Sequence, residues 1–195
     1  MTPRASDWAE TATGSDNAEA TLEHSAGAAD RRHKLTFLSA GFDDTANAAL
    51  DLYGLSKVGP MDLTDTAVLD LTADTFTVSG HGLANADKVV FHTLGGTAPT
   101  GLTSGNTYFV VGVSGDDFQL ESSVGGGAID MSGTQANFAT EALILPLSKS
   151  FPVYDHLEVA LHSPLNGVAR APLILKLAAG GAGIAGKLNM AGYTL

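Results

Sequence analysis

Apolar and polar residues alternate along the last third of the chain. Leu157, Val159 and Leu161 occupy every second position between polar or small residues, which is typical of a β-strand with one buried face. Residues 173–177 repeat the pattern, with leucine at every second position. Prolines punctuate this region, so we expect its strands to lie at sheet edges or to begin at a proline.

Other segments indicate extended structure as well. Residues 35–39 favour a strand, whereas residues 45–53 fit a short helix or an irregular strand, and their pattern does not decide between the two. Residues 178–195 contain five glycines and are expected to form an extended C-terminal strand or arm. No alternation of helical and strand patterns is present, which argues against a doubly wound α/β fold. The expected class is mainly β, a sandwich or barrel.

The middle of the chain has a shorter rhythm. Four runs dense in Phe, Val, Tyr and Thr are separated by glycine-rich breakers, as expected for strands joined by hairpins. These runs are residues 75–78, 88–92, 107–113 and 118–121. We therefore expect a small β-hairpin module, residues 71–140, inserted into a main β-domain made of residues 35–70 and 141–195.

Residues 1–34 are rich in Ala, Thr, Ser, Asp and Glu, and their large apolar residues are Trp8 and Leu22. A segment of this composition offers little apolar surface to offset the entropy of ordering it. We expect an extended N-terminal arm that is held by another subunit, with a clamp within the same chain as the alternative.

Charge is unevenly distributed. The formal net charge is -11, and residues 35–140 hold twelve acids against two bases, which argues against nucleic acid as a partner.

There is no cysteine, so disulfides and thiolate metal sites are excluded. No stretch approaches the roughly 18 consecutive apolar residues of a membrane span. The N-terminus lacks the apolar core of a signal peptide, so we expect neither a membrane partner nor Sec export.

One block resembles a small β-module that recurs in bacteriophage structural proteins. The matching segments, in order, are Val78–Leu83 (VSGHGL), Asp87–Phe91 (DKVVF), Pro99–Leu102 (PTGL), Thr107–Val111 (TYFVV), Asp117–Leu120 (DFQL) and Gly125–Asp130 (GGGAID). Two departures are Ala98, where the module usually has leucine, and the interruption by Gly95 and Gly96. The resemblance covers about a third of the chain and implies a virion protein without saying which part of the particle.

From these observations we expect a non-enzymatic structural component of a phage virion. The leading hypothesis is a head decoration or cement protein on the capsid surface, a trimer that binds the major capsid protein across capsomers by burying apolar area at about 25 cal/mol per Å². The alternatives are a tail protein, either a tube subunit or a fibre segment, and a carbohydrate-binding adhesion module. The expected assembly contacts are the apolar and basic residues of the two chain ends, namely Trp8, Leu22, Arg31, Arg32, Lys34, Leu188, Tyr193 and Leu195.

Candidate chemistry was weighed against simpler interpretations. Residues 181–186 match G-x-G-x-x-G, but a dinucleotide site also needs a following helix and an acid about 20 residues on. His156, Glu158 and His162 share one strand face and are interpreted as a polar face, not a metal site. The paired aspartates, such as Asp116 and Asp117, are interpreted as turn carboxylates. No cofactor and no metal are expected.

Overall fold

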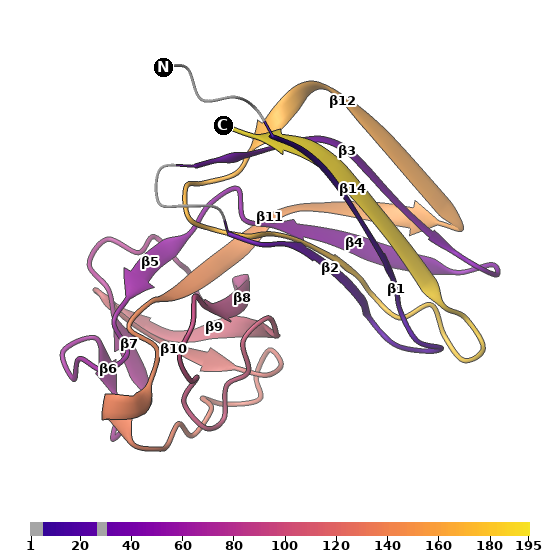
Figure 1. Ribbon diagram of the computed structural model, residues 1–195. Coiled ribbons are helices and arrows are strands. Elements are labelled where there is room, and N and C mark those ends of the chain that lie inside the picture. The colour runs from indigo at the N-terminus through magenta and orange to yellow at the C-terminus, as the bar shows by residue number, and fades with distance from the viewer. Residues whose placement is uncertain (1–5, 27–30) are drawn as a thin grey trace. The chain divides into compact units, whose positions relative to one another are not determined.

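The computed structural model describes residues 6–26 and 31–195 (Figure 1). Its described part is built from strands, with one short 3-10 helix and no α-helix. The chain divides into two compact units, one formed by residues 1–56 and 148–195 and the other by residues 57–147. The prediction of a mainly β chain with a sandwich is confirmed.

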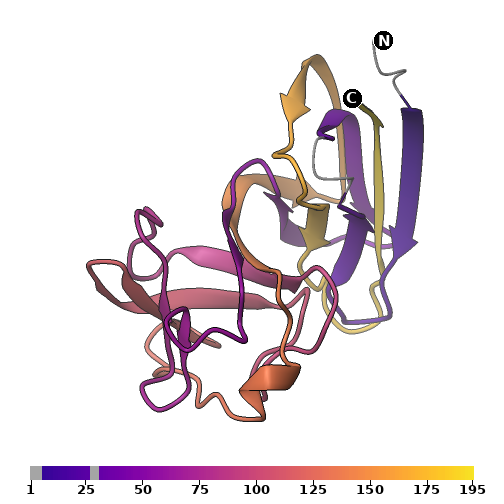
Figure 2. The same cartoon turned by 60° about the vertical axis from the view of Figure 1, so that its left-hand side comes forward.

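The first unit is a sandwich of two four-stranded layers. Its strands are β1 Ser6–Thr13, β2 Ala20–His24, β3 His33–Phe42, β4 Asn47–Tyr53, the second half of β11 Ala142–Tyr154, β12 His156–Asn166, β13 Leu173–Leu177 and β14 Gly186–Thr194. One layer has the order β1-β14-β3-β12, and the other has the order β2-β13-β4-β11. Figure 2 shows β1, in indigo, running beside β14, in yellow.

The strands pair as one long antiparallel two-stranded ribbon, wound so that it forms both layers. The first strand of this unit pairs with its last, the second with the seventh, the third with the sixth and the fourth with the fifth. The layers are completed by the pairs β14–β3 and β13–β4. Eight strands arranged in this way form a jelly roll.

The core of the sandwich is built from the inward positions of these strands. Leucine dominates on β3, β4 and β13, where Leu38, Leu50 and Leu175 have no exposed surface. Each such leucine contributes about 1.5–3 kcal/mol when it is buried. The glycine-rich C-terminal segment also forms a strand, because Leu188 and Met190 of β14 supply its buried face.

The N-terminal segment differs from the extended arm expected from the sequence. Residues 6–13 form β1 at an edge of one layer, and residues 20–24 form β2 at an edge of the other layer. Composition was a poor guide here because an edge strand needs few large side chains on its inner face; Ala20 and Leu22 suffice on β2. The parts of the expected arm at residues 1–5 and 27–30 lie outside the described residues.

The second unit has its own sheet and core. Its elements are β5 Val58–Met61, β6 Leu69–Asp70, β7 Thr75–Thr77, β8 Lys88–Thr93, β9 Thr107–Ser114, β10 Asp117–Glu121, the 3-10 helix η1 Gln135–Asn137 and the first half of β11. The strand order is β6-β7-β10-β9-β8-β11, and β5 also pairs with β11. The rings of Phe76 and Phe118 stack in the core, with centroids 5.3 Å apart.

The residues of the module pattern have structural roles in this unit. Gly80 and Gly82, which flank His81, both have positive φ. The backbone N–H of Leu83 donates to Nδ1 of His81 over 2.9 Å, and the His81 ring packs against Phe118. The pattern therefore fixes a turn onto the core of the unit.

The unit is larger than the predicted insertion. It spans residues 57–147 and not 71–140, because β5, β6 and the first half of β11 complete its sheet. Its two ends are paired with each other, since Met61 lies opposite Ala142 and Val58 lies opposite Ile144. It is inserted between the fourth and fifth strands of the jelly roll, at the tip of the wound ribbon.

Candidate functional site

Several of the predicted contact residues lie at one end of the β1-β14-β3-β12 layer. Lys34 on β3 is paired with Tyr193 on β14, and two residues further out Arg32 and Leu195 are joined by two backbone hydrogen bonds, of 3.0 and 3.1 Å. Arg31 precedes Arg32 in the chain. We call Arg31, Arg32, Lys34, Tyr193 and Leu195 the terminal patch.

The terminal patch combines cationic and apolar surface. Arg31 and Arg32 are exposed, Lys34 and Tyr193 are partly exposed, and Leu195 is 41% exposed, one of few large apolar side chains so exposed among residues 6–26 and 31–195. The Lys34 ammonium donates a hydrogen bond to the Asn166 side chain. Such a surface suits an acidic partner with an apolar component.

The other predicted contact residues, Trp8, Leu22 and Leu188, are partly or fully buried. Leu22 and Leu188 are buried in the sandwich core, at 5% and 0% exposure. Their side chains are therefore unavailable to a partner while the sandwich is intact. Trp8 lies on the inner side of β1 and is partly buried against the core.

On the inner side of β3 and β14, His33 and Thr194 join residues of β1 and β2 in a cluster that closes the β1–β2 side of the sandwich. Trp8 of β1 stacks on His24 of β2, with centroids 3.9 Å apart and planes 14° apart. His33 of β3 meets the His24 ring edge-on, at 4.4 Å and 80°. We call Trp8, Glu10, His24, His33 and Thr194 the histidine cluster.

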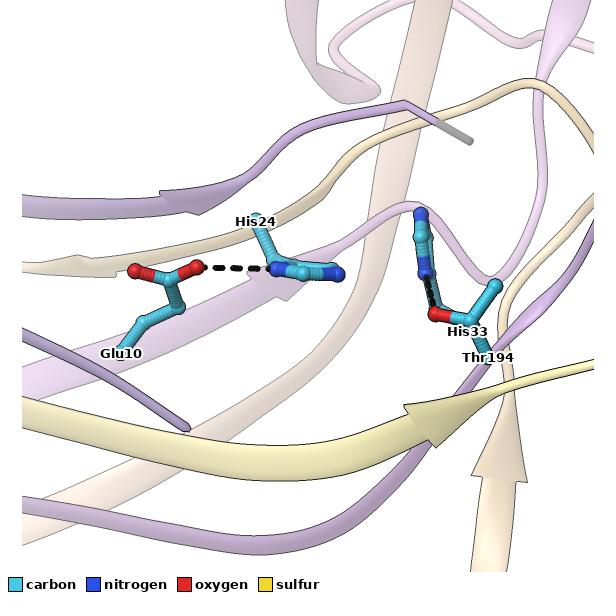
Figure 3. Close-up of polar contacts among 4 residues, drawn as sticks. All are labelled: Glu10, His24, His33 and Thr194. Carbon is cyan, nitrogen blue, oxygen red and sulfur yellow. Dashed lines mark hydrogen bonds and ion pairs between the residues drawn. The ribbon is translucent and has the colours of Figure 1, made fainter. Parts of the chain in front are cut away.

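Two hydrogen bonds orient the imidazoles (Figure 3). Nδ1 of His24 lies 3.0 Å from Oε1 of Glu10, and because a carboxylate can only accept, this nitrogen is the donor. Nδ1 of His33 lies 2.9 Å from the Thr194 hydroxyl on β14. The cluster thus connects β1 with β2, and β3 with β14.

His33 is the most buried of these groups, at 2% exposure. Its Nε2 and the indole N–H of Trp8 are buried and have no hydrogen-bond partner. Burial lowers the pKa of His33 below the ordinary 6.5, the nearby His24 lowers it further, and the backbone of Ser25 partly offsets both effects. The neutral form of His33 is therefore the one that this environment accommodates.

Sequence reasoning missed this cluster. Trp8, His24 and His33 all fall in the segment that was interpreted as an arm, and the strand that completes the cluster, β14, is about 160 residues away in the chain. The sequence feature that could have indicated this cluster is the presence of the sole tryptophan and two of the six histidines in a segment otherwise poor in aromatic side chains.

The other candidates of the sequence are placed as follows. Residues 181–186 end where β14 begins, so a strand and not a helix follows the G-x-G-x-x-G match. His156, Glu158 and His162 are exposed on one face of β12, as predicted. Among the described residues, no group of three or more His, Cys, Asp or Glu side chains is arranged to hold a metal ion.

The aspartates that were interpreted as turn carboxylates accept backbone hydrogen bonds. Asp62 accepts from the N–H of Thr64, and Asp65 accepts from that of Ala67. Asp116 accepts from the N–H of Gly80 over 3.1 Å. None of the helical segments among the described residues is long and apolar enough to cross a membrane.

No protein-family model matches this chain, and no curated protein matches it. The class of protein is therefore defined by its architecture, a jelly-roll β-sandwich that carries a second β-unit at the tip of its ribbon.

Proposed function

We propose that this chain is a non-enzymatic structural subunit of a phage-type virion, acting as a head decoration protein that binds the major capsid protein across capsomers. The support is twofold. Residues 78–130 resemble a module of phage structural proteins, and the sandwich is a jelly roll, an architecture used by viral capsid domains as well as by lectins and cupins.

The observation that carries the proposal is the separation of charge between the two units. Residues 57–147 contain ten acids and two bases, whereas the rest of the chain contains eleven acids and eight bases. An acidic unit of this kind suits solvent, and the terminal patch on the other unit offers arginines beside exposed apolar surface. We therefore assign the contact with the particle to the terminal patch.

The chemistry of the patch favours a carboxylate-bearing partner. Arginine presents a planar fork that matches a carboxylate in a bidentate fashion, and charges at the rim of an interface mainly steer association. Leu195 and Tyr193 supply the apolar contact that such an interface needs at its centre. The partner expected is an acidic, partly apolar surface on a neighbouring virion subunit.

Charge reversal of the patch tests this assignment. The double substitution Arg31→Glu and Arg32→Glu should abolish or strongly weaken binding to particles that lack the protein, measured by co-sedimentation, because it places four units of charge change at the contact. Far-UV circular dichroism should remain unchanged, since both side chains are exposed.

The matched control is Lys149→Glu with Lys187→Glu. It makes the same change in net charge at exposed positions, and Lys187 lies on β14 at the opposite end from Tyr193. Retained binding by the control and lost binding by the arginine variant supports the proposal. Equal binding by both variants contradicts it.

The principal alternative is a tail protein, a tube subunit or a fibre segment. Rings or filaments formed by the purified protein without capsids would favour it over the decoration role, for which a discrete oligomer, a trimer, is expected.

The carbohydrate-binding alternative was tied to exposed aromatic side chains on the inserted hairpins. Among the described residues, the exposed large apolar side chain of the inserted unit is Val124, at 63%, and the exposed aromatic is Tyr154, at 68%, on the part of β11 that belongs to the sandwich. This distribution gives that alternative little support.

A further inference from the structure

The histidine cluster brings two imidazoles into contact on the buried side of one sandwich edge. The centroids of His24 and His33 are 4.4 Å apart, and the His24 ring is itself covered by Trp8. Two neutral rings pack well in this arrangement. Two imidazolium ions at this separation would repel each other in a site with little water to screen them.

The groups that face the cluster provide charge compensation for one imidazole only. From β1, the Glu10 carboxylate is hydrogen-bonded to His24 and is 41% exposed. From β14, His33 meets only the neutral Thr194 hydroxyl. From β13, the residue paired with His24 is Leu173.

The main chain and the flanking bases do not outweigh the cost of a charge on His33. The backbone of Ser25 raises the pKa of His33, but burial, the largest effect, and the nearby His24 lower it, and the net pKa is lowered. The carbonyl of His33 accepts the N–H of Gly167 over 2.9 Å, so this contact is made by the main chain and not by the ring. Arg32 and Lys34 flank His33 in sequence and belong to the exposed terminal patch, and both are cations.

We propose that the histidine cluster is a pH-dependent clasp, which holds the β1–β2 side of the sandwich closed while His33 is neutral and releases it when His33 binds a proton. A proton on His33 places a cation in the buried part of the cluster, where Nε2 has no hydrogen-bond partner and the contact on β14 is the neutral Thr194 hydroxyl. Separation of β1 and β2 at this edge exposes that charge to water and admits water to Trp8.

The sign of the effect follows from the direction of the His33 shift. Its pKa in the folded chain is below the 6.5 of the unfolded chain, so the unfolded chain binds the proton first. The full contribution of neutral His33 to stability is present above pH 6.5 and is lost as the pH falls through the folded pKa. In that window the folding equilibrium constant falls by up to about tenfold per pH unit.

Trp8 makes the clasp directly observable, because it is the sole tryptophan of the chain and stacks on His24. The isolated protein is titrated from pH 7.5 to pH 5 while tryptophan emission and its quenching by acrylamide are recorded. The expected result is a reversible rise in quenching with a midpoint below pH 6.5, while far-UV circular dichroism still shows β-structure. No particle is needed, so the outcome is independent of the proposed virion role.

Two substitutions separate the clasp from a general acid effect. His33→Asn removes the buried imidazole that binds the proton and should abolish the transition, whereas His162→Asn, at an exposed position on β12, should leave it unchanged. A transition that persists in His33→Asn, or quenching of Trp8 that is independent of pH, overturns the proposal. If His33→Asn does not fold, NMR titration of the wild-type His33 decides, and a pKa of 6.5 or above overturns the proposal.

Discussion

Lys176 lies on the outer face of the central strand β13 and is only 6% exposed. Its ammonium is 2.7 Å from Oε1 of Glu19, and the residue paired with it on β4 is Asp51, which accepts a hydrogen bond from Ser150 over 2.6 Å. These polar contacts connect residues beside β2, on β4 and on β11. A buried ammonium needs a partner of opposite charge, so removing the Glu19 carboxylate would leave the Lys176 charge without the ion pair that it makes here.

Gly192 of β14 lies close against both β3 and β1. A Cβ there would lie 2.0 Å from the carbonyl oxygen of Lys34 and 2.7 Å from Cζ2 of Trp8, beside a register shift between the two strands. Because a backbone oxygen cannot rotate away, we expect Gly192→Ala to lower the free energy of unfolding by about 3 kcal/mol.

Urea denaturation followed by Trp8 fluorescence measures this loss. Gly183→Ala is the control, since its position has positive φ but nothing within 4 Å, and only about 1 kcal/mol is expected from the backbone. Equal stabilities of the two variants would show that the close approach at Gly192 is not a constraint.

At the scale of elements, the sequence was informative wherever a strand has its own apolar pattern. The strands at residues 88–93, 107–114, 117–121 and 173–177 were predicted within one or two residues, because each carries large β-formers between glycines or prolines. The undecided segment 45–53 became β4, since its partners β13 and β11 select the extended form.

β1 and β2 could not be predicted in the same way. Their inward residues are mostly small, and their stability comes from pairing with β14 and β13, which lie far away in the chain. The sequence also does not mark the end of the inserted unit, because β11 runs without interruption from one unit into the other. Residue type predicted that Arg31, Arg32 and Leu195 are exposed, whereas the burial of Leu22 and Leu188 could be recognised only from the fold.

Removal of β1 tests whether the N-terminal segment is part of the sandwich. Deletion of residues 1–13 should leave β14 with an open edge and Trp8 absent, so we expect aggregation or loss of cooperative unfolding, measured by size-exclusion chromatography and thermal circular dichroism. Deletion of residues 1–5 leaves β1 intact and is the control. A soluble product with an unchanged melting temperature after the longer deletion would restore the arm interpretation.

At the scale of the whole molecule, two separate cores support two units. The core of residues 57–147 includes Phe76, Phe91 and Phe118, and that of the sandwich is dominated by leucine. The ends of the inserted unit are paired with each other through β5 and β11. Such an arrangement is typical of a domain inserted at a surface tip.

We therefore expect residues 57–147 to fold when expressed alone. In the complementary variant, a short Gly-Ser linker joins residues 1–56 to 148–195, which is feasible because the N–H of Leu55 donates to the Ser148 hydroxyl over 3.3 Å. Dispersed amide spectra and cooperative unfolding of both pieces are the expected results. Two unfolded pieces would mean that the cores depend on each other.

The pairing of β1 with β14 also sets an order of events during synthesis. Residues 6–13 leave the ribosome early, but their partner, residues 186–194, is made at the very end of the described chain. The inserted unit has all its own partners within residues 57–147 and can fold while translation continues. Strand β1 therefore stays unpaired with β14 until residues 186–194 have been made. A nascent chain that stalls before residue 186 exposes β1 to chaperones and proteases.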